Sequence, residues 1–147
     1  MPKYNVNIKK LDETAVIPVR GSDYAAGYDL YANLEYSVVI KPHETVKIGT
    51  GVAMNIPENH FGAIFARSGL ATKKGLRPAN CVGVVDEDYT GELIVAVHND
   101  SDETKVINPK ERIAQLAFVP YSTANFIEVE ELTVTERGDN GFGSTGE

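Results

Sequence analysis

The chain has 147 residues, of which 42% are hydrophobic, so it is long enough for one domain with a buried core. Its 14 Lys and Arg residues against 21 Asp and Glu residues give a net charge of −7, whereas proteins that bind duplex DNA or anionic membranes are usually basic. Composition therefore argues against nucleic acid and membrane as partners. It leaves room for a small phosphorylated ligand at a locally basic site.

Short stretches of alternating apolar and polar side chains predict half-buried β-strands. In chain order these strands are expected around residues 6–8, 36–40, 46–48, 52–56, 62–66, 82–85, 93–97, 113–119 and 126–129. One short helix is expected over residues 68–74, with Gly75 as its C-cap. Many short strands and a single helix favour an all-β sandwich, jelly roll or barrel.

Cysteine usage and hydropathy bear on the compartment. Cys81 is the one cysteine, so neither an intrachain disulfide nor a cysteine-rich zinc site can form. No stretch approaches the ~18 apolar residues of a membrane span, and the N-terminal residues do not form a targeting segment. The sequence therefore predicts a cytoplasmic protein.

Residues 136–147 differ in composition from the rest of the chain. They contain four glycines, and Phe142 is their only large apolar side chain, so we expect a flexible arm after a folded core of residues 1–135. The arm spells G-x-G-x-x-G, but it follows no strand and opens no helix, and Ser144 stands where a P-loop has its lysine. Glycine-rich backbone beside Arg137 can still cradle a phosphate, and a disordered tail is the alternative.

An acidic run, Asp86-Glu87-Asp88, lies between two predicted strands and is expected at a hairpin tip. A calcium loop starting at Asp86 would need a glutamate where Val97 stands, which excludes that interpretation. Asp86 follows three apolar residues, so we expect it to be partly buried and able to orient a water as a general base. A solvated acidic hairpin is the alternative.

Two further stretches carry charged side chains in apolar surroundings. Arg67-Ser68-Gly69 opens the predicted helix, where backbone N–H groups, a hydroxyl and a guanidinium can converge on one anion. The alternative is a capping serine with a surface arginine. Asp29 lies among apolar neighbours and is expected to be an ordered carboxylate, in a binding site, a turn or an ion pair.

These stretches belong to a series of five that runs in order from residue 26 to the C-terminal region. The series comprises Ala26-Gly27-Tyr28-Asp29-Leu30, Arg67-Ser68-Gly69-Leu70-Ala71, Asn80 with Gly83-Val84-Val85-Asp86-Glu87-Asp88-Tyr89-Thr90-Gly91, Arg112-Ile113-Ala114-Gln115-Leu116, and Arg137-Gly138-Asp139-Asn140-Gly141-Phe142-Gly143-Ser144-Thr145-Gly146. Together they resemble the five motifs of the homotrimeric dUTP pyrophosphatases, or dUTPases.

The resemblance implies a distorted jelly roll of the β-clip type and a homotrimer with shared active sites. It implies hydrolysis of dUTP to dUMP and pyrophosphate with Mg²⁺ on the triphosphate, which keeps uracil out of DNA and supplies dUMP for thymidylate synthesis. Each site would take Asp29, Arg67 and Gln115 from one subunit, the segment of Asp86 from a second, and the arm from a third.

The resemblance also implies a role for each motif residue. Asp86 would activate the water that attacks the α-phosphorus, and Asp29 would hold waters around Mg²⁺. The remaining residues would bind substrate. The uracil would be bound by Asn80, Gly83 and Val85, the deoxyribose by Tyr89, and the phosphates by Arg67, Ser68, Gly69 and Gln115. In the arm, Phe142 would lie over the uracil, and the γ-phosphate would be covered by Arg137, Gly143, Ser144 and Thr145.

Two other functions remain open at this point. A dCTP deaminase of the same superfamily is the enzymatic alternative, although the complete glycine-rich arm and the Asp86 segment favour dUTP hydrolysis. A regulatory protein that uses the nucleotide as a switch is the alternative from a different class, because an intact active site is compatible with a second role. A purely structural β-trimer would not explain the arginines, serines and aspartates at all five motif positions.

Overall fold

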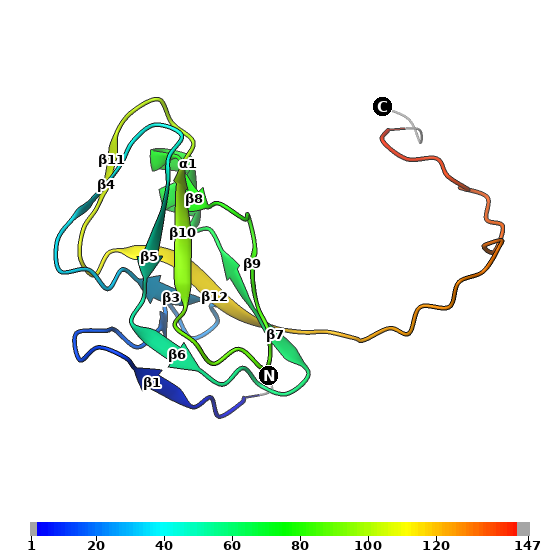
Figure 1. The fold of residues 1–147 in the computed structure, drawn as a ribbon, viewed down its shortest axis with the longest axis horizontal. Coiled ribbons are helices and arrows are strands. Elements are labelled where there is room, and N and C mark those ends of the chain that lie inside the picture. Colours follow the sequence, from blue (N-terminus) through cyan, green and yellow to red (C-terminus); the bar gives the residue numbers. More distant parts are fainter. Residues whose placement is uncertain (1–2, 144–147) are drawn as a thin grey trace.

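The computed structural model describes residues 3–143, and within them the chain forms twelve strands and one helix. The strands are β1 (Ile8–Lys10), β2 (Val19–Arg20), β3 (Tyr28–Tyr31), β4 (Val38–Ile40), β5 (Thr45–Gly49), β6 (Val52–Met54), β7 (His60–Phe65), β8 (Leu76–Pro78), β9 (Gly83–Val85), β10 (Ile94–Asn99), β11 (Lys105–Ile107) and β12 (Arg112–Pro120), and the helix is α1 (Ser68–Lys74) (Figure 1). The prediction of an all-β fold with one short helix is confirmed.

The strands of the described residues pair antiparallel throughout and form four sheets. The largest has the order β2-β3-β12-β7-β9, and a second has the order β5-β10-β8. Two smaller sheets pair β1 with β6 and β4 with β11. Aliphatic side chains of these sheets share one core, whose fully buried members include Leu30, Ile48, Val97, Ile113 and Leu116. This shared core joins the sheets into one folded unit.

Most of the predicted strands coincide with observed ones, but four observed strands were missed. These are β2, β3, β8 and β11, each only two to four residues long. In β3 the adjacent residues Asp29 and Leu30 are both buried, so the strand lacks the alternation that marks a half-buried strand. In β8 a proline occupies the last position, which sequence reasoning takes as a strand breaker.

The segment after β9 is not a hairpin tip, so that prediction is wrong. β9 is an edge strand of the five-stranded sheet and pairs with β7, whereas β10 lies between β5 and β8 in another sheet. Alternation identifies the faces of a strand but not its partner, and two successive strands can therefore belong to different sheets. Asp86 consequently stands where the chain leaves a sheet edge.

Helix α1 has the predicted bounds, and its ends follow from its sequence. Gly75 adopts φ 68°, the left-handed conformation that favours glycine, and its N–H donates to the carbonyl of Ala71 at 3.0 Å. Leu70 is the buried residue of the helix. Arg67 is the N-cap in extended conformation and makes no side-chain capping bond, so Ser68 is not the capping residue. The alternative interpretation of Ser68 as an N-cap is wrong.

Residues 121–143 form no helix or strand and leave the folded body after β12 (Figure 1). The strand predicted over residues 126–129 is therefore not formed in this chain. Its apolar side chains instead face solvent, together with those that follow: Phe126, Ile127, Val129, Leu132 and Val134. Neighbouring exposed apolar side chains are typical of an interaction surface. Ser144 and Thr145 lie outside the described residues.

Candidate active site

A carboxylate between two guanidinium groups lies beside the end of β7. The Nε of Arg67 donates to Oδ1 of Asp29 at 2.9 Å, and Nη1 of Arg112 donates to Oδ2 at 3.5 Å. Asp29 is 9% exposed, and the Arg67 side chain is 28% exposed. Two positive charges against one negative leave this cluster with net positive charge at the surface, which suits an anionic ligand.

Gln115 belongs to the same cluster because β12 and β3 place it directly opposite Asp29. Its Nε2 donates to the carbonyl of Ala66 at 2.9 Å, next to Arg67 in the chain. Gly27 makes room for this side chain, because a Cβ built there would collide with Oε1 of Gln115. Three residues predicted to handle the triphosphate are thus neighbours, and a glycine explains how they fit.

Ser68 and Gly69 extend the cluster along the first turn of α1, and both are exposed. A Cβ at Gly69 would meet no heavy atom within 4 Å, so nothing inside the chain requires a glycine there. A glycine without an internal reason is consistent with close approach of an external group to the backbone. The geometry therefore puts Arg67, Ser68 and Gly69 together, as the sequence predicts.

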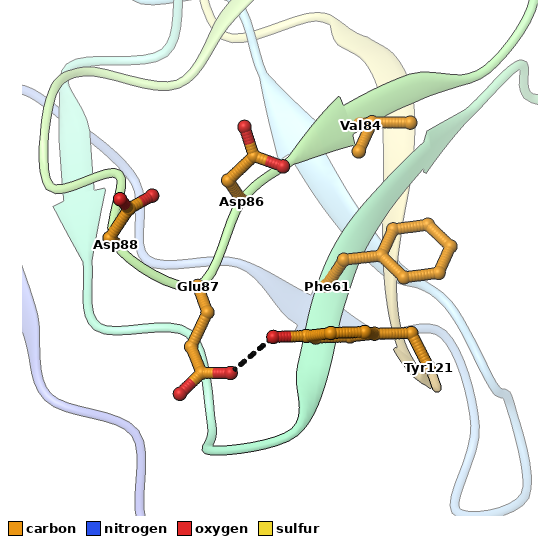
Figure 2. Close-up of a pocket in the computed structure, with 6 residues that line it drawn as sticks. All are labelled: Phe61, Val84, Asp86, Glu87, Asp88 and Tyr121. Carbon is orange, nitrogen blue, oxygen red and sulfur yellow. Dashed lines mark hydrogen bonds between the residues drawn. The ribbon is translucent and has the colours of Figure 1, made fainter. Parts of the chain in front are cut away.

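Asp86 lies immediately after β9, where the register pairs Gly62 of β7 with Val85. Figure 2 shows Asp86 and Asp88 on one side of the chain and Glu87 pointing the other way, toward Tyr121. Asp86 is exposed in this chain, and Glu87 is the half-buried member of the acidic run. The expectation that Asp86 is partly buried is wrong, because it follows an edge strand.

Asp86 and its neighbours in the chain line an open cavity of about 770 Å³, together with Phe61 and Tyr121 (Figure 2). Tyr89 folds back over its own turn, where its Oη donates to the carbonyl of Glu92 at 2.8 Å. A Cβ at Gly91 would lie 2.6 Å from that Oη, so the glycine is needed for this position of the ring. The turn holds Tyr89 in a defined place before any ligand arrives.

The predicted uracil-binding positions lie before Asp86, around β9. Gly83 and Val85 are buried in β9, and a Cβ at Gly83 would come within 3.1 Å of the Cβ of Ile64. Asn80 is exposed and precedes Cys81, whose φ of 62° turns the chain sharply. The backbone of this segment is therefore fixed by packing and by a tight turn.

One chain does not bring Asp86 to the arginine cluster. Asp86 is level with Phe61 at the start of β7, whereas Arg67 follows the end of that strand. An extended chain rises about 3.3 Å per residue, so the backbone of residue 61 is roughly 20 Å from that of Arg67. Asp86 and the arginine cluster therefore lie at opposite ends of one strand, and Gly83, level with Ile64, lies between them.

Residues 136–143 of the arm are exposed and make no hydrogen bond to Asp86 or to the arginine cluster. Phe142 is fully exposed, Gly143 adopts φ 84°, and Nε of Arg137 donates to the carbonyl of Asn140 at 2.9 Å within the arm itself. Ser144 and Thr145, also predicted to bind substrate, lie outside the described residues. Within residues 3–143, Asp86, the arginine cluster and the described part of the arm are thus separate from one another.

Sequence reasoning missed three residues that take part in these clusters: Arg112, Glu87 and Tyr121. Arg112 stood within a recognised motif, and its charge beside an apolar strand was the available signal. The bond from Tyr121 to Glu87 joins positions 34 residues apart, so no local pattern could have indicated it.

Neither a metal cage nor a membrane helix is found in the part of the chain that the structure describes. Residues 3–143 contain no group of three or more His, Cys, Asp and Glu side chains that could hold a metal ion. The single helix of these residues is neither long nor apolar enough to cross a membrane.

The fold and the Asp29 cluster define an all-β jelly-roll protein with a guanidinium-rich site of the kind that binds anions. A dUTPase family model matches residues 13–146, nearly the whole chain. The chain belongs to the dUTPase family.

Relatives and solved structures agree with this assignment. The deoxyuridine 5'-triphosphate nucleotidohydrolase of Nautilia profundicola is 47% identical over 96% of this chain and 98% of the relative. That of Desulfitobacterium hafniense is 44% identical over 98% and 96%. The dUTPase of Staphylococcus bacteriophage 80alpha with dUPNHPP superimposes with a TM-score of 0.89 at 32% identity, covering 99% of this chain and 100% of that one. The predicted jelly roll of the β-clip type is confirmed by this likeness.

Proposed function

We propose that this protein hydrolyses dUTP to dUMP and pyrophosphate by attack of a water molecule on the α-phosphorus. The observation that carries the proposal is the cluster of Asp29, Arg67 and Gln115, which combines an ordered guanidinium, an amide and net positive charge. Hydrolysis of a triphosphate mainly requires neutralisation of charge and in-line positioning of water. Membership of the dUTPase family supports dUTP as the substrate.

The cluster provides a fixed binding surface for phosphates. Asp29 holds Arg67 by its Nε, which leaves the terminal nitrogens of that guanidinium free to bind phosphate oxygens. Gln115 is oriented by the carbonyl of Ala66, and the exposed Ser68 and Gly69 add a hydroxyl and backbone groups. These groups would bind the β- and γ-phosphates without rearranging.

A magnesium ion fits the residues as part of the substrate complex. A carboxylate has about four acceptor positions, and Asp29 uses two for Arg67 and Arg112, so it can still accept hydrogen bonds from metal-bound waters. Mg²⁺ keeps several waters and is commonly held by one or two carboxylates and substrate phosphates. When bound, it would neutralise charge on the triphosphate.

Asp86 would act as the general base. Its carboxylate is exposed and stands beside an open cavity, so it can accept a proton from a water held against the α-phosphorus. The separation of roughly 20 Å along β7 argues that Asp86 and Arg67 of one chain do not serve the same substrate. We therefore assign them to sites between neighbouring subunits of a homotrimer.

The arm would complete each site from a third subunit. Its exposed apolar side chains need a surface in another molecule, and Phe142, fully exposed here, would cover the uracil. Arg137, Gly143, Ser144 and Thr145 would then lie over the phosphates. An arginine delivered from a neighbouring chain is a known means of stabilising charge during phosphoryl transfer.

Base and sugar would be selected on the segment around β9. Asn80, Gly83 and Val85 offer an amide and ordered backbone, which can pair with the polar edge of uracil and leave cytosine unpaired. Tyr89, held by Gly91 and Glu92, would pack beneath the deoxyribose, where a 2′-hydroxyl would clash. The reaction would remove dUTP as a source of uracil in DNA and supply dUMP for thymidylate synthesis, in the cytoplasm.

A pyrophosphate-release assay across dUTP, UTP, dCTP and dTTP tests the function. We expect release from dUTP at least about 10²-fold faster than from the others, because hydrogen-bonding pockets leave wrong partners unpaired. Chelation of Mg²⁺ should abolish it. Equal turnover of all four nucleotides would contradict the proposal, and ammonia released from dCTP would indicate a deaminase instead.

A further inference from the structure

Glu87 fastens the Asp86 segment to the folded body through a single carboxylate oxygen. Its Oε2 accepts a hydrogen bond from the Oη of Tyr121 at 2.9 Å (Figure 2). The same oxygen accepts a second bond from the backbone N–H of Asn59, also at 2.9 Å. Asn59 precedes β7, and Tyr121 follows β12. The two anchors therefore flank β7 and β12, which are neighbours in the five-stranded sheet whose edge strand is β9.

The anchors are themselves tied together, so they offer Glu87 a rigid support. The backbone N–H of Tyr121 donates to the carbonyl of Asn59 at 3.2 Å, which closes a ring of three contacts. Hydrogen bonding to Glu87 is the main cause that raises the pKa of the Tyr121 phenol above its ordinary value near 10, with burial adding to it. The phenol is thus protonated, and a donor, throughout the neutral range.

The segment has little else to hold it. Pairing between β9 and β7 ends at Val85. Beyond it, the N–H of Tyr89 donates to the carbonyl of Asp86 at 3.1 Å, which closes a turn. Glu87 and Asp88 are the two central residues of this turn, so holding the Glu87 side chain against the sheet fixes the orientation of the turn and of the aspartates on either side of Glu87. Figure 2 shows Glu87 pointing toward Tyr121, and Asp86 and Asp88 pointing the other way.

We propose that Glu87 is a positioning residue that, through Tyr121 and Asn59, fixes the direction in which Asp86 presents its carboxylate to the attacking water. This inference rests on the proposed role of Asp86 in dUTP hydrolysis. Glu87 itself would touch neither the substrate nor the reacting atoms. Its contribution lies in preventing the base from sampling other orientations, since small displacements of catalytic groups cost rate.

Four variants separate this role from a general loss of stability. Glu87→Ala removes the acceptor, and Tyr121→Phe removes one donor. Glu87→Gln keeps an oxygen that can accept both bonds, so it should restore the function. Glu58→Ala is the matched control, because it removes the same charge at a neighbouring position. Glu58 is exposed, precedes Asn59, and its side chain makes no hydrogen bond within residues 3–143.

We expect Glu87→Ala to lower kcat for dUTP about tenfold, with KM within about twofold of the parent value. Tyr121→Phe should lower kcat less. In Glu87→Gln and Glu58→Ala, kcat should stay within about twofold of the parent value. In an Asp86→Asn background, Glu87→Ala should lower the residual rate no further, because the group it positions is gone. An equal loss in both backgrounds would overturn the inference.

Amide hydrogen exchange tests the contact of Glu87 with Tyr121 and Asn59 independently of catalysis. In the nucleotide-free protein, amides of residues 86–89 should exchange faster in Glu87→Ala and Tyr121→Phe than in Glu87→Gln and Glu58→Ala. Unchanged exchange in Glu87→Ala overturns the inference whatever the substrate, and faster exchange with unchanged kcat overturns the positioning role. An inactive parent protein refutes the proposed function, and with it the catalytic part of this inference.

Discussion

Replacing Asp86 by asparagine should lower kcat for dUTP by about 10³-fold or more, while a non-hydrolysable dUTP analogue binds within about threefold of the parent affinity. The amide has nearly the same shape as the carboxylate but cannot accept the proton of the attacking water. Pyrophosphate release measures the first quantity, and calorimetric titration of the analogue measures the second.

Asp88→Asn is the control for this experiment, because it removes the same charge on the same side of the chain (Figure 2). Its kcat should remain within about tenfold of the parent value, since it is not the proposed base. Retention of more than a tenth of the parental turnover in Asp86→Asn would refute the assignment of Asp86. A loss of analogue binding equal to the loss of kcat would instead make Asp86 a binding residue.

Removal of residues 138–147 should lower kcat/KM for dUTP by about 10²-fold to 10³-fold without unfolding the protein, by analogy with the removal of preorganised groups around a developing charge. Residues 138–143 lie in an exposed segment remote from the core, so the midpoint of thermal denaturation should shift by less than about 3 °C. Steady-state kinetics and circular dichroism provide the two measurements.

Phe142→Ala keeps the length of the arm and removes only its aromatic ring. It should reproduce part of the loss, chiefly in KM, whereas Phe142→Tyr should retain most of the activity because a ring remains to stack on the base. Full activity of the shortened chain would show that the arm does not close the site. Unfolding of the shortened chain would contradict its separation from the core.

Local signals in the sequence predicted local structure well. The bounds of α1 and the role of Gly75 follow from the apolar pair Leu70 and Ala71, two lysines and a glycine, all within eight residues. Most strands followed from alternation, and the buried pair Asp29 and Leu30 shows why β3 was missed. Strand partners were not predictable in this way, which is why the segment after β9 was wrongly expected to be a hairpin.

The residues of the candidate site likewise include some that the sequence predicted and others that depend on long-range contacts. Asp29, Arg67 and Gln115 were expected together on the resemblance to a family. The physical reason for their proximity is the register of β12, which pairs Gln115 with Asp29 of β3 and with Phe65 of β7, two residues before Arg67. Arg112 as the second cation on Asp29, and Tyr121 as the donor to Glu87, depend on contacts between distant parts of the chain. Such contacts carry no periodicity, so only the folded structure reveals them.

The length of β7 has a consequence for mixtures of inactive subunits. If Asp86 and Arg67 at its two ends serve different sites, an Asp86→Asn chain and an Arg67→Ala chain carry complementary defects. Random reassembly of equal amounts should restore roughly a quarter of the sites, because each site needs one intact contributor of each kind, with probability about one half for each. A site built within one chain would give no recovery at all. Complementation between the two inactive variants would thus show that the two ends of the six-residue strand β7 serve different sites.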